Sequence, residues 1–251
     1  MIPRLKADLR FSDLLALRPR GNKFADIRAF ESAFARLAGQ DHAVFFPYGR
    51  TAQMAILKAL HLEKSGRTEV IMPSYSCVVV AHAITQAGLT PVFVDVGDDY
   101  NMRLDLLNQA TTEKTGAVIA TSIFGHPVDL DALDTYRRQH PDIPILQDCA
   151  HSFLAQYQDG RYVHQQGLCA FYGLNISKII TSIFGGMVTT DDAFFASPPS
   201  LNKAVLTPFG MTRRDGRSAS NDPGLNQVLD AADKSVCLVG KTWDFHVDVA
   251  L

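Results

Sequence analysis

The 251-residue sequence lacks the features that mark several protein classes. Its formal net charge is only −2, with 24 Lys and Arg against 26 Asp and Glu, so no excess of positive charge indicates nucleic-acid binding. Its longest apolar run, residues 77–84, is interrupted by His82 and is far shorter than the roughly 20 residues that cross a bilayer. Charged residues within the first 20 positions argue against a secretory leader. We therefore expect a cytoplasmic protein without a transmembrane segment.

Metal-binding and nucleotide-binding motifs are also missing. No G-x-G-x-x-G follows a predicted strand and no G-x-x-x-x-G-K-[ST] is present, which disfavours dinucleotide and P-loop nucleotide binding. The histidines are scattered without metal-ligand spacing, so we predict no metal site. The four cysteines lack such spacing too, and we interpret them as reduced core residues: Cys77, Cys149, Cys169 and Cys237.

The hydrophobic pattern, in contrast, is informative. Short β-branched runs alternate with longer segments of helical periodicity, which predicts an α/β domain with a largely parallel sheet. The predicted strands are residues 42–46, 69–72, 91–96, 116–121, 143–147, 169–172 and 187–190. The predicted helices are residues 25–37, 51–62, 78–87, 104–110 and 129–139. Functional groups are then expected at the carboxyl ends of the strands, where Gly49, Ser74 and Asp148 fall.

Two residues suggest a cofactor. Asp148 follows a predicted buried strand, and Lys178 is flanked by isoleucines that would disfavour an ammonium and favour the neutral, nucleophilic amine. Pyridoxal phosphate needs a lysine that carries it as an imine and a carboxylate that pairs with its pyridine nitrogen. Two plainer alternatives exist, because Asp148 could be a helix N-cap and Lys178 a lysine that extends its amine into water.

A second segment has the composition of a phosphate site. Gly49, Arg50 and Thr51 follow the first predicted strand and open the helix predicted from residue 51. Backbone N–H groups at a helix start attract anions, glycine allows close approach, and the hydroxyl and guanidinium add donors and charge. The alternative is an ordinary glycine turn before a helix.

Together these residues resemble the DegT/DnrJ/EryC1/StrS sugar aminotransferases, which are pyridoxal-phosphate enzymes of the aspartate-aminotransferase fold (fold type I). The resemblance covers about residues 23–192 and rests on seven segments in the order of the family. They are GRTA at 49–52, IMPSYS at 71–76, PVFVDV at 91–96, IFGHPVDL at 123–130, QDCAHS at 147–152, NISK at 175–178 and GGMVTT at 185–190.

The resemblance implies an architecture and a reaction. The fold would be the large domain of a pyridoxal-phosphate-dependent transferase, a three-layer α/β/α arrangement with a mostly parallel seven-stranded sheet. The chain would comprise an N-terminal arm (1–22), this cofactor-binding domain (23–192) and a divergent C-terminal segment (193–251). The family reaction moves an amino group, usually from glutamate, to a keto group of a nucleotide-linked sugar, for surface polysaccharides or natural products. Its members are typically homodimers.

The resemblance also implies residue roles. Lys178 would carry the cofactor and shuttle the proton, Asp148 would hold the pyridine nitrogen, and His151 would support the ring or its phenolic oxygen. These three are the expected catalytic residues. The expected cofactor-binding residues are these three together with Gly49, Arg50, Thr51, Cys77 and Asn175.

Several positions depart from the family pattern. Gly173 stands where a serine often binds the cofactor phosphate, and Cys77 stands where an aromatic ring stacks on the pyridine, a role for which Tyr75 is a candidate substitute. Residues 183–184 replace a glycine-acidic pair. Residues 196–200 and 211–223 have turn and loop composition, and no small C-terminal domain is recognisable. We therefore expect a truncated or frameshifted member; the alternative is a non-catalytic regulatory or interaction protein built on the same scaffold.

Overall fold

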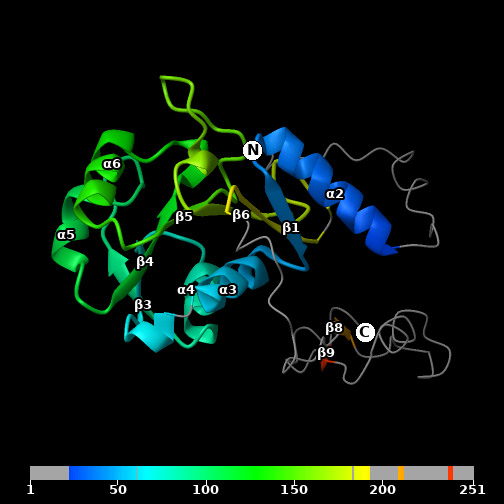
Figure 1. Ribbon diagram of the computed structural model, residues 1–251, viewed down its shortest axis with the longest axis horizontal. Helices are drawn as coiled ribbons and strands as arrows, with labels where there is room; N and C mark the ends of the chain where they lie inside the picture. The colour runs from blue at the N-terminus through cyan, green and yellow to red at the C-terminus, as the bar shows by residue number, and fades with distance from the viewer. Residues whose placement is uncertain (1–22, 61, 183, 193–208, 212–236, 240–251) are drawn as a thin grey trace, which may run out of the picture. The chain divides into compact units, whose positions relative to one another are not determined.

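The computed structural model describes residues 23–60, 62–182, 184–192, 209–211 and 237–239. The chain divides into two units, residues 1–197 and 198–251. The first unit contains a seven-stranded sheet with helices packed against it (Figure 1). The predicted arm at residues 1–22 and most of the predicted C-terminal segment lie outside the described residues.

All seven predicted strands are present, with ends within two residues of those predicted. The order across the sheet is β1-β7-β6-β5-β4-β2-β3. From β6 to β3 all neighbours are parallel, whereas β7 runs antiparallel to both β1 and β6. The mostly parallel sheet is thus confirmed. The strands are β1 (His42–Phe46), β2 (Glu69–Pro73), β3 (Thr90–Val94), β4 (Thr115–Thr121), β5 (Ile145–Asp148), β6 (Cys169–Gly173) and β7 (Gly186–Thr190).

The helices follow the predicted periodicity with one change. The segment predicted as a helix over residues 104–110 is a 3-10 turn, η2 (Leu104–Leu106), followed by the single-turn α5 (Leu107–Ala110). The other α-helices are α2 (Lys23–Ala38), α3 (Gly49–Ala59), α4 (Val78–Gln86) and α6 (Leu130–Gln139). Asp129 caps α6, because its carboxylate accepts a hydrogen bond from the Ala132 N–H at 3.1 Å. Further 3-10 turns are η1 (Leu62–Ser65), η3 (Ile123–Gly125) and η4 (Val163–Gln165).

The inner strands β2, β4, β5 and β6, together with β7, are almost entirely buried, which explains their continuous apolar composition, whereas β1 and β3 at the two ends of the sheet are only partly buried. Val70 and Met72 of β2 pack with α3 and α4, which lie side by side (Figure 1). Ile71, between them in the chain, points to the opposite face and packs with Leu107 of α5 and Leu133 of α6. Both faces of the sheet are therefore covered by helices, and the predicted three-layer α/β/α architecture is confirmed.

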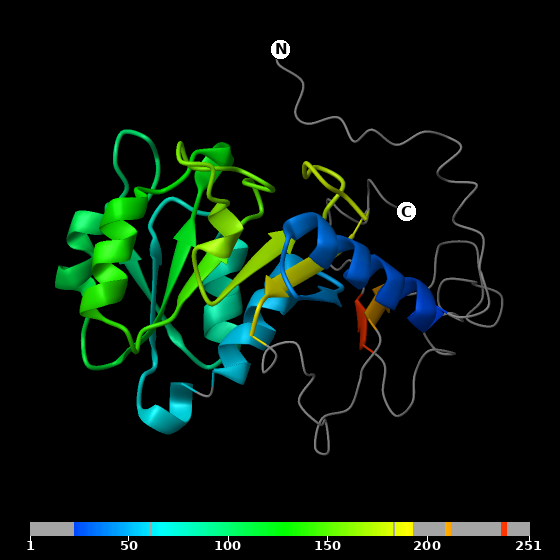
Figure 2. The same cartoon turned by 45° about the horizontal axis from the view of Figure 1, so that its top comes forward.

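A third cluster covers the end of the sheet that contains β1, β7 and β6. Phe34 of α2 packs edge-to-face on Tyr172 of β6, with ring centroids 5.1 Å apart, and Phe153 completes the aromatic group. Figure 2 shows α2 lying along β1 at this end of the sheet. Since β7 is the one strand that pairs with β1 in the described part of the chain, α2 supplies much of the remaining support of β1.

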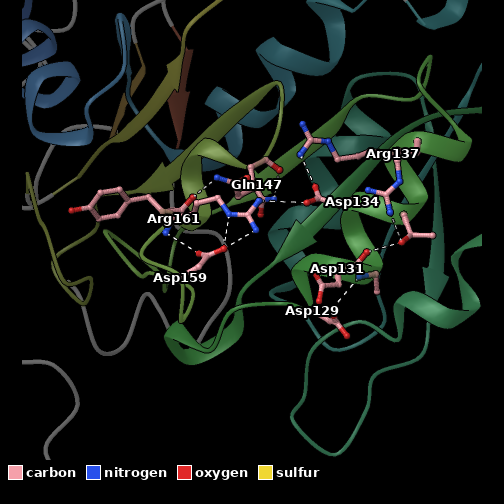
Figure 3. A network of polar contacts seen from close by, with 12 residues as sticks. Asp129, Asp131, Asp134, Arg137, Gln147, Asp159 and Arg161 are labelled. Atoms are coloured by element: carbon pink, nitrogen blue, oxygen red, sulfur yellow. Dashed lines mark hydrogen bonds and ion pairs between the residues drawn. The ribbon is translucent and has the colours of Figure 1, made fainter.

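A surface network fixes one loop to α6 (Figure 3). Arg161 donates a 2.7 Å hydrogen bond to Asp159 and lies 3.5 Å from Asp134 of α6, which also pairs with Arg137 at 3.2 Å. All four side chains are partly exposed, so water and salt screen their charges and each ion pair adds little to the stability of the fold. The network therefore orients the loop at residues 157–161 more than it stabilises the fold.

The second unit contributes one described pair of strands, β8 (Phe209–Met211) and β9 (Cys237–Val239), which are parallel. Neither strand was predicted from the sequence. Among the described residues, no helix has both the length and the apolar character needed to cross a membrane.

Candidate active site

Asp148 lies at the carboxyl end of the sheet, as predicted for a functional group. It is the last residue of β5 and pairs in register with Thr121 on β4 and Phe171 on β6. The alternative reading as a helix N-cap is wrong, because the backbone from Cys149 onward bends and no helix follows. Asp148 is instead a carboxylate held at the carboxyl end of an inner strand.

The Asp148 carboxylate is deeply buried, with 4% of its surface exposed. One oxygen accepts a hydrogen bond from the Ala150 N–H at 3.1 Å, and the other lies 3.5 Å from the Thr121 hydroxyl. Burial raises the pKa of Asp148 above its ordinary value, while the Ala150 N–H, the Lys178 charge and the Thr121 hydroxyl oppose that rise. A carboxylate with one good donor and this much burial fits a further cationic N–H, which the pyridinium of pyridoxal phosphate would provide.

Lys178 is carried by a turn that Asn175 shapes. The Lys178 N–H donates to the Asn175 carbonyl at 2.9 Å, and the Asn175 side chain accepts from the Ser177 N–H at 3.2 Å. The base of the loop is closed where the Leu174 N–H donates to the Gly185 carbonyl at 2.9 Å. A Cβ on Gly173 would lie 3.4 Å from the Lys178 Cε, so the lysine reaches the carboxyl end of β6. Its charge acts on the carboxylate of β5 from there.

The apolar environment expected around Lys178 is only partly present. Ile176 and Ile179 are 50% and 55% exposed, so they do not shield the amine as predicted. Ile180 alone of the three packs against the core, at the cluster that contains Tyr172 and Leu174. The reason is geometric: the residues form an exposed turn, in which side chains do not share one face as they would in a helix or a strand.

His151 joins Asp148 and Lys178 at this edge. Its half-buried imidazole stacks on Phe124 with centroids 5.8 Å apart and planes 16° apart. Burial, with a smaller effect of the Lys178 charge, lowers the pKa of His151 below its ordinary value. Its Nδ1 is buried without a hydrogen-bond partner among the described residues, which leaves that atom available for a ligand.

The predicted phosphate turn begins α3 directly, because Gly49 is the first residue of the helix. The first N–H groups of any helix have no partner within it, which suits an anion. The Thr51 hydroxyl donates to the Tyr48 carbonyl at 2.7 Å and accepts from the Tyr48 N–H at 3.1 Å, so it builds the turn. Arg50 is exposed, with its guanidinium 4.9 Å from the centre of the Tyr48 ring.

Three glycines bring this turn to the lysine. A Cβ on Gly49 would lie 3.1 Å from the Gly173 Cα, and a Cβ on Gly186 would lie 2.5 Å from the Gly49 nitrogen. The start of α3, the end of β6 and the start of β7 therefore meet backbone to backbone. Gly173, one of the departures from the family pattern, touches both the helix start and Lys178.

Cys77 lies further along the sheet edge. It precedes α4 at the end of β2, and β4 separates β2 from β5. Cys77 is exposed, so its interpretation as a core residue is wrong: its position before α4 turns the thiol to the surface. Cys149 and Cys169 are buried as predicted, and burial raises the pKa of Cys149 to about 12. The burial of Cys237 lies outside what the structure describes.

An exposed aromatic group borders the site and was missed in the sequence. Tyr75, the candidate substitute for the missing ring at Cys77, packs against Tyr100 at 5.5 Å and Phe124 at 6.4 Å between centroids. The sequence offered a signal for this group, because a phenylalanine directly before glycine in the segment IFGHP suggests an unusual turn that could expose the ring. Within the described residues, no cluster of three metal-ligating side chains is present.

Comparison with known proteins agrees with this geometry. Residues 20–239 match the model of the DegT/DnrJ/EryC1/StrS aminotransferase family. The chain is 30% identical over 167 residues to a GDP-perosamine synthase of Escherichia coli O157:H7. It is 34% identical over 168 residues to a UDP-N-acetyl-3-dehydro-alpha-D-glucosamine 3-aminotransferase of Acidithiobacillus ferrooxidans. Each alignment covers 66% of this chain but only 45% and 44% of the relative, so the chain spans less than half the length of these proteins.

Solved structures show the same fold. The aminotransferase from Psychrobacter cryohalolentis superimposes with a TM-score of 0.65 and 28% identity, over 73% of this chain and 46% of its own. The Helicobacter pylori aminotransferase involved in pseudaminic acid biosynthesis superimposes with a TM-score of 0.66 and 24% identity, over 74% of this chain and 49% of its own. With its sheet, its sequence segments and its extensive match to the family model, this chain belongs to the DegT/DnrJ/EryC1/StrS aminotransferase family.

Proposed function

We propose that this protein is a pyridoxal-phosphate-dependent aminotransferase that acts on a keto group of a nucleotide-linked sugar. The observation that supports this most strongly is the buried Asp148 carboxylate, which has one good internal donor and an electrostatic partner in Lys178 at the carboxyl end of the sheet. The family to which the chain belongs uses pyridoxal phosphate.

Each part of the cofactor has a candidate partner in this arrangement. Asp148 would pair with the pyridine nitrogen, and Lys178 would bind the carbonyl carbon. The first N–H groups of α3 and the exposed Arg50 would hold the phosphate. Thr51 keeps the turn in shape, since its hydroxyl already bonds to the backbone of Tyr48. When bound, the cofactor supplies an electron sink for the carbon that loses or gains the amino group.

The chain's own residues would then handle protons. The Lys178 amine, released from the cofactor by an incoming amine, is the group that would move a proton at the reacting carbon. The unpartnered His151 Nδ1 would contact the cofactor ring or its phenolic oxygen. Asn175 would act by holding the turn that presents the lysine, because both its carbonyl and its side chain accept backbone hydrogen bonds there.

The substrate class is taken from the relatives. Their printed names specify GDP-perosamine and a UDP-linked dehydro-glucosamine, so we propose a nucleotide sugar as acceptor and glutamate as amino donor, in polysaccharide or natural-product biosynthesis. A homodimer in the cytoplasm is part of the same proposal.

One set of observations favours a second candidate, a non-catalytic regulatory or interaction protein of the same family. The expected stacking ring is replaced by an exposed Cys77, and the phosphate-binding serine is replaced by Gly173. Retention of Lys178 beside the buried carboxylate favours the enzyme.

The test is covalent trapping. The purified protein is mixed with pyridoxal phosphate, its visible spectrum is recorded, and borohydride reduction is followed by peptide mapping. We expect a new absorbance band and a pyridoxyl adduct on Lys178; Lys178→Met should lose both, whereas Lys58→Met, which removes an exposed lysine on α3, should retain both. Conversion of the bound cofactor by glutamate, followed by amination of keto-sugar nucleotides, would complete the assignment. Absence of the band and the adduct would favour the non-catalytic candidate.

A further inference from the structure

Phe124 has an unfavourable backbone conformation, and burial of its side chain does not explain that conformation. Phe124 has φ of 53° and is followed by Gly125 with φ of 84°. A left-handed conformation costs a non-glycine residue about 1 kcal/mol or more. Burial of an apolar side chain could offset such a cost, but Phe124 is 67% exposed. Backbone strain at an exposed aromatic residue calls for another reason.

The loop is held in this conformation by a buried amide. Asn101, which is 2% exposed, accepts a hydrogen bond from the Ile123 N–H at 3.1 Å through its side-chain oxygen. Its side-chain nitrogen donates to the carbonyls of His126 at 3.1 Å and Pro127 at 3.3 Å. One side chain thus fixes both ends of the loop around Phe124.

The fixed loop packs against His151 in two ways. The Phe124 ring stacks on the imidazole, with planes only 16° apart. The backbone also approaches closely, since a Cβ on Gly125 would lie 3.3 Å from the His151 carbonyl oxygen. Backbone and ring together confine one face of the histidine, and neither contact requires the cofactor.

We propose that Phe124 is a positioning residue whose ring holds the His151 imidazole in the orientation that presents its unpartnered nitrogen to the site. This inference rests on the proposed function for the identity of the ligand, but the stacking itself can be measured in the cofactor-free protein. The strained turn is then the means by which an exposed ring reaches the histidine.

The electrostatic surroundings of His151 agree with this role. Lys178 is the charged group that acts on the imidazole, and Asp148 lies three residues before it at the end of β5. Burial is the main cause of the lowered pKa of His151, and the stacked ring is part of that burial. The imidazole is therefore neutral at neutral pH, with one nitrogen able to donate and the other to accept.

The test uses Phe124→Asn, because asparagine tolerates the left-handed conformation while it removes the ring. Phe124→Tyr keeps the ring. The matched control is Tyr100→Asn: Tyr100 is also exposed, has φ of 63°, and has its ring contacts with Tyr75 and Phe124. The His151 ring signals are assigned by comparison with His151→Gln and titrated by NMR in the absence of cofactor.

We expect Phe124→Asn to abolish the ring-current shift of the His151 signals and to raise the titration midpoint of His151 towards the ordinary value of about 6.5. Phe124→Tyr and Tyr100→Asn should behave like the parent. In the presence of cofactor, Phe124→Asn should bind pyridoxal phosphate about two- to tenfold more weakly, the loss expected for one stacked ring pair.

The proposal is overturned if Phe124→Asn leaves the His151 signals and midpoint unchanged, or if Tyr100→Asn shifts them equally, because the effect would then belong to the whole aromatic group. Failure of the proposed function is distinguishable from both results. In that case the NMR changes would occur as expected, while Lys178 of the parent would form no borohydride adduct.

Discussion

Replacement of Asp148 by asparagine should stabilise the cofactor-free protein. Asparagine has almost the same shape, and its side-chain oxygen can still accept from the Ala150 N–H. Transfer of a carboxylate from water into the protein costs several kcal/mol, of which a hydrogen bond from a backbone N–H returns about 1.5–3 kcal/mol. The Thr121 hydroxyl, at 3.5 Å, adds little, and Lys178 offsets a further part. A net desolvation cost of about 1–2 kcal/mol then remains for the ionised carboxylate, and Asp148→Asn should remove it.

The pH dependence of the stability difference between Asp148→Asn and the parent gives a sharper test of this desolvation cost. Burial raises the folded-state pKa of Asp148 above the unfolded value of about 3.9, so the ionised group weakens the native state at neutral pH. That penalty is relieved as the pH falls through the folded-state pKa towards 3.9. The urea midpoint of Asp148→Asn should therefore exceed that of the parent at pH 7.5, and the difference should shrink on acidification. A variant less stable than the parent at pH 7.5, or a difference that grows in acid, would refute the reasoning.

Three further predictions concern packing, surface charge and thiol reactivity. Gly186→Ala should lower the free energy of unfolding by about 1–3 kcal/mol, since its Cβ would overlap the start of α3; an unchanged urea midpoint would contradict the close approach. Arg161→Ala should lower the urea midpoint only slightly, and this effect should fade in high salt; a large fall in the midpoint would mean that the network supports the fold. In a Cys237→Ser background, Cys77 should react rapidly with a thiol reagent in the native protein, whereas Cys149 and Cys169 should react only after unfolding; equal rates would contradict their burial.

Periodicity predicted the elements of the sheet because both of its faces are covered. A strand buried on two sides must be apolar at every position, and the central strand β4 is buried throughout. The position of Asp148 was predicted in the same way, since a polar residue that ends an apolar run lies at the carboxyl end of its strand. The apolar spacing was less reliable for predicting the type of helix at residues 104–110. A short 3-10 turn such as η2 and a single α-helical turn such as α5 have the same spacing of apolar residues.

The site contains features that a linear pattern cannot reveal. The exposure of Ile176 and Ile179 depends on the turn that Asn175 builds. The three isoleucines near Lys178 in the sequence do not predict that turn. The stacking of Phe124 on His151 joins the segments that follow β4 and β5. It depends on the buried Asn101, which lies elsewhere in the chain. Such contacts are set by tertiary geometry, so the sequence predicted candidate site residues but not the contacts that support them.

The antiparallel strand β7 has a consequence for how the protein is made. β1 is a mostly apolar strand, HAVFF, and among the described strands it pairs with β7 alone, with His42 in register with Thr190. On a ribosome that adds about 5–20 residues per second, β1 would wait roughly 7 to 30 seconds for its partner to be synthesised. Throughout that time an unpaired hydrophobic edge is open to other chains. We therefore expect nascent chains to depend on chaperones at the end of the sheet beside the start of α3.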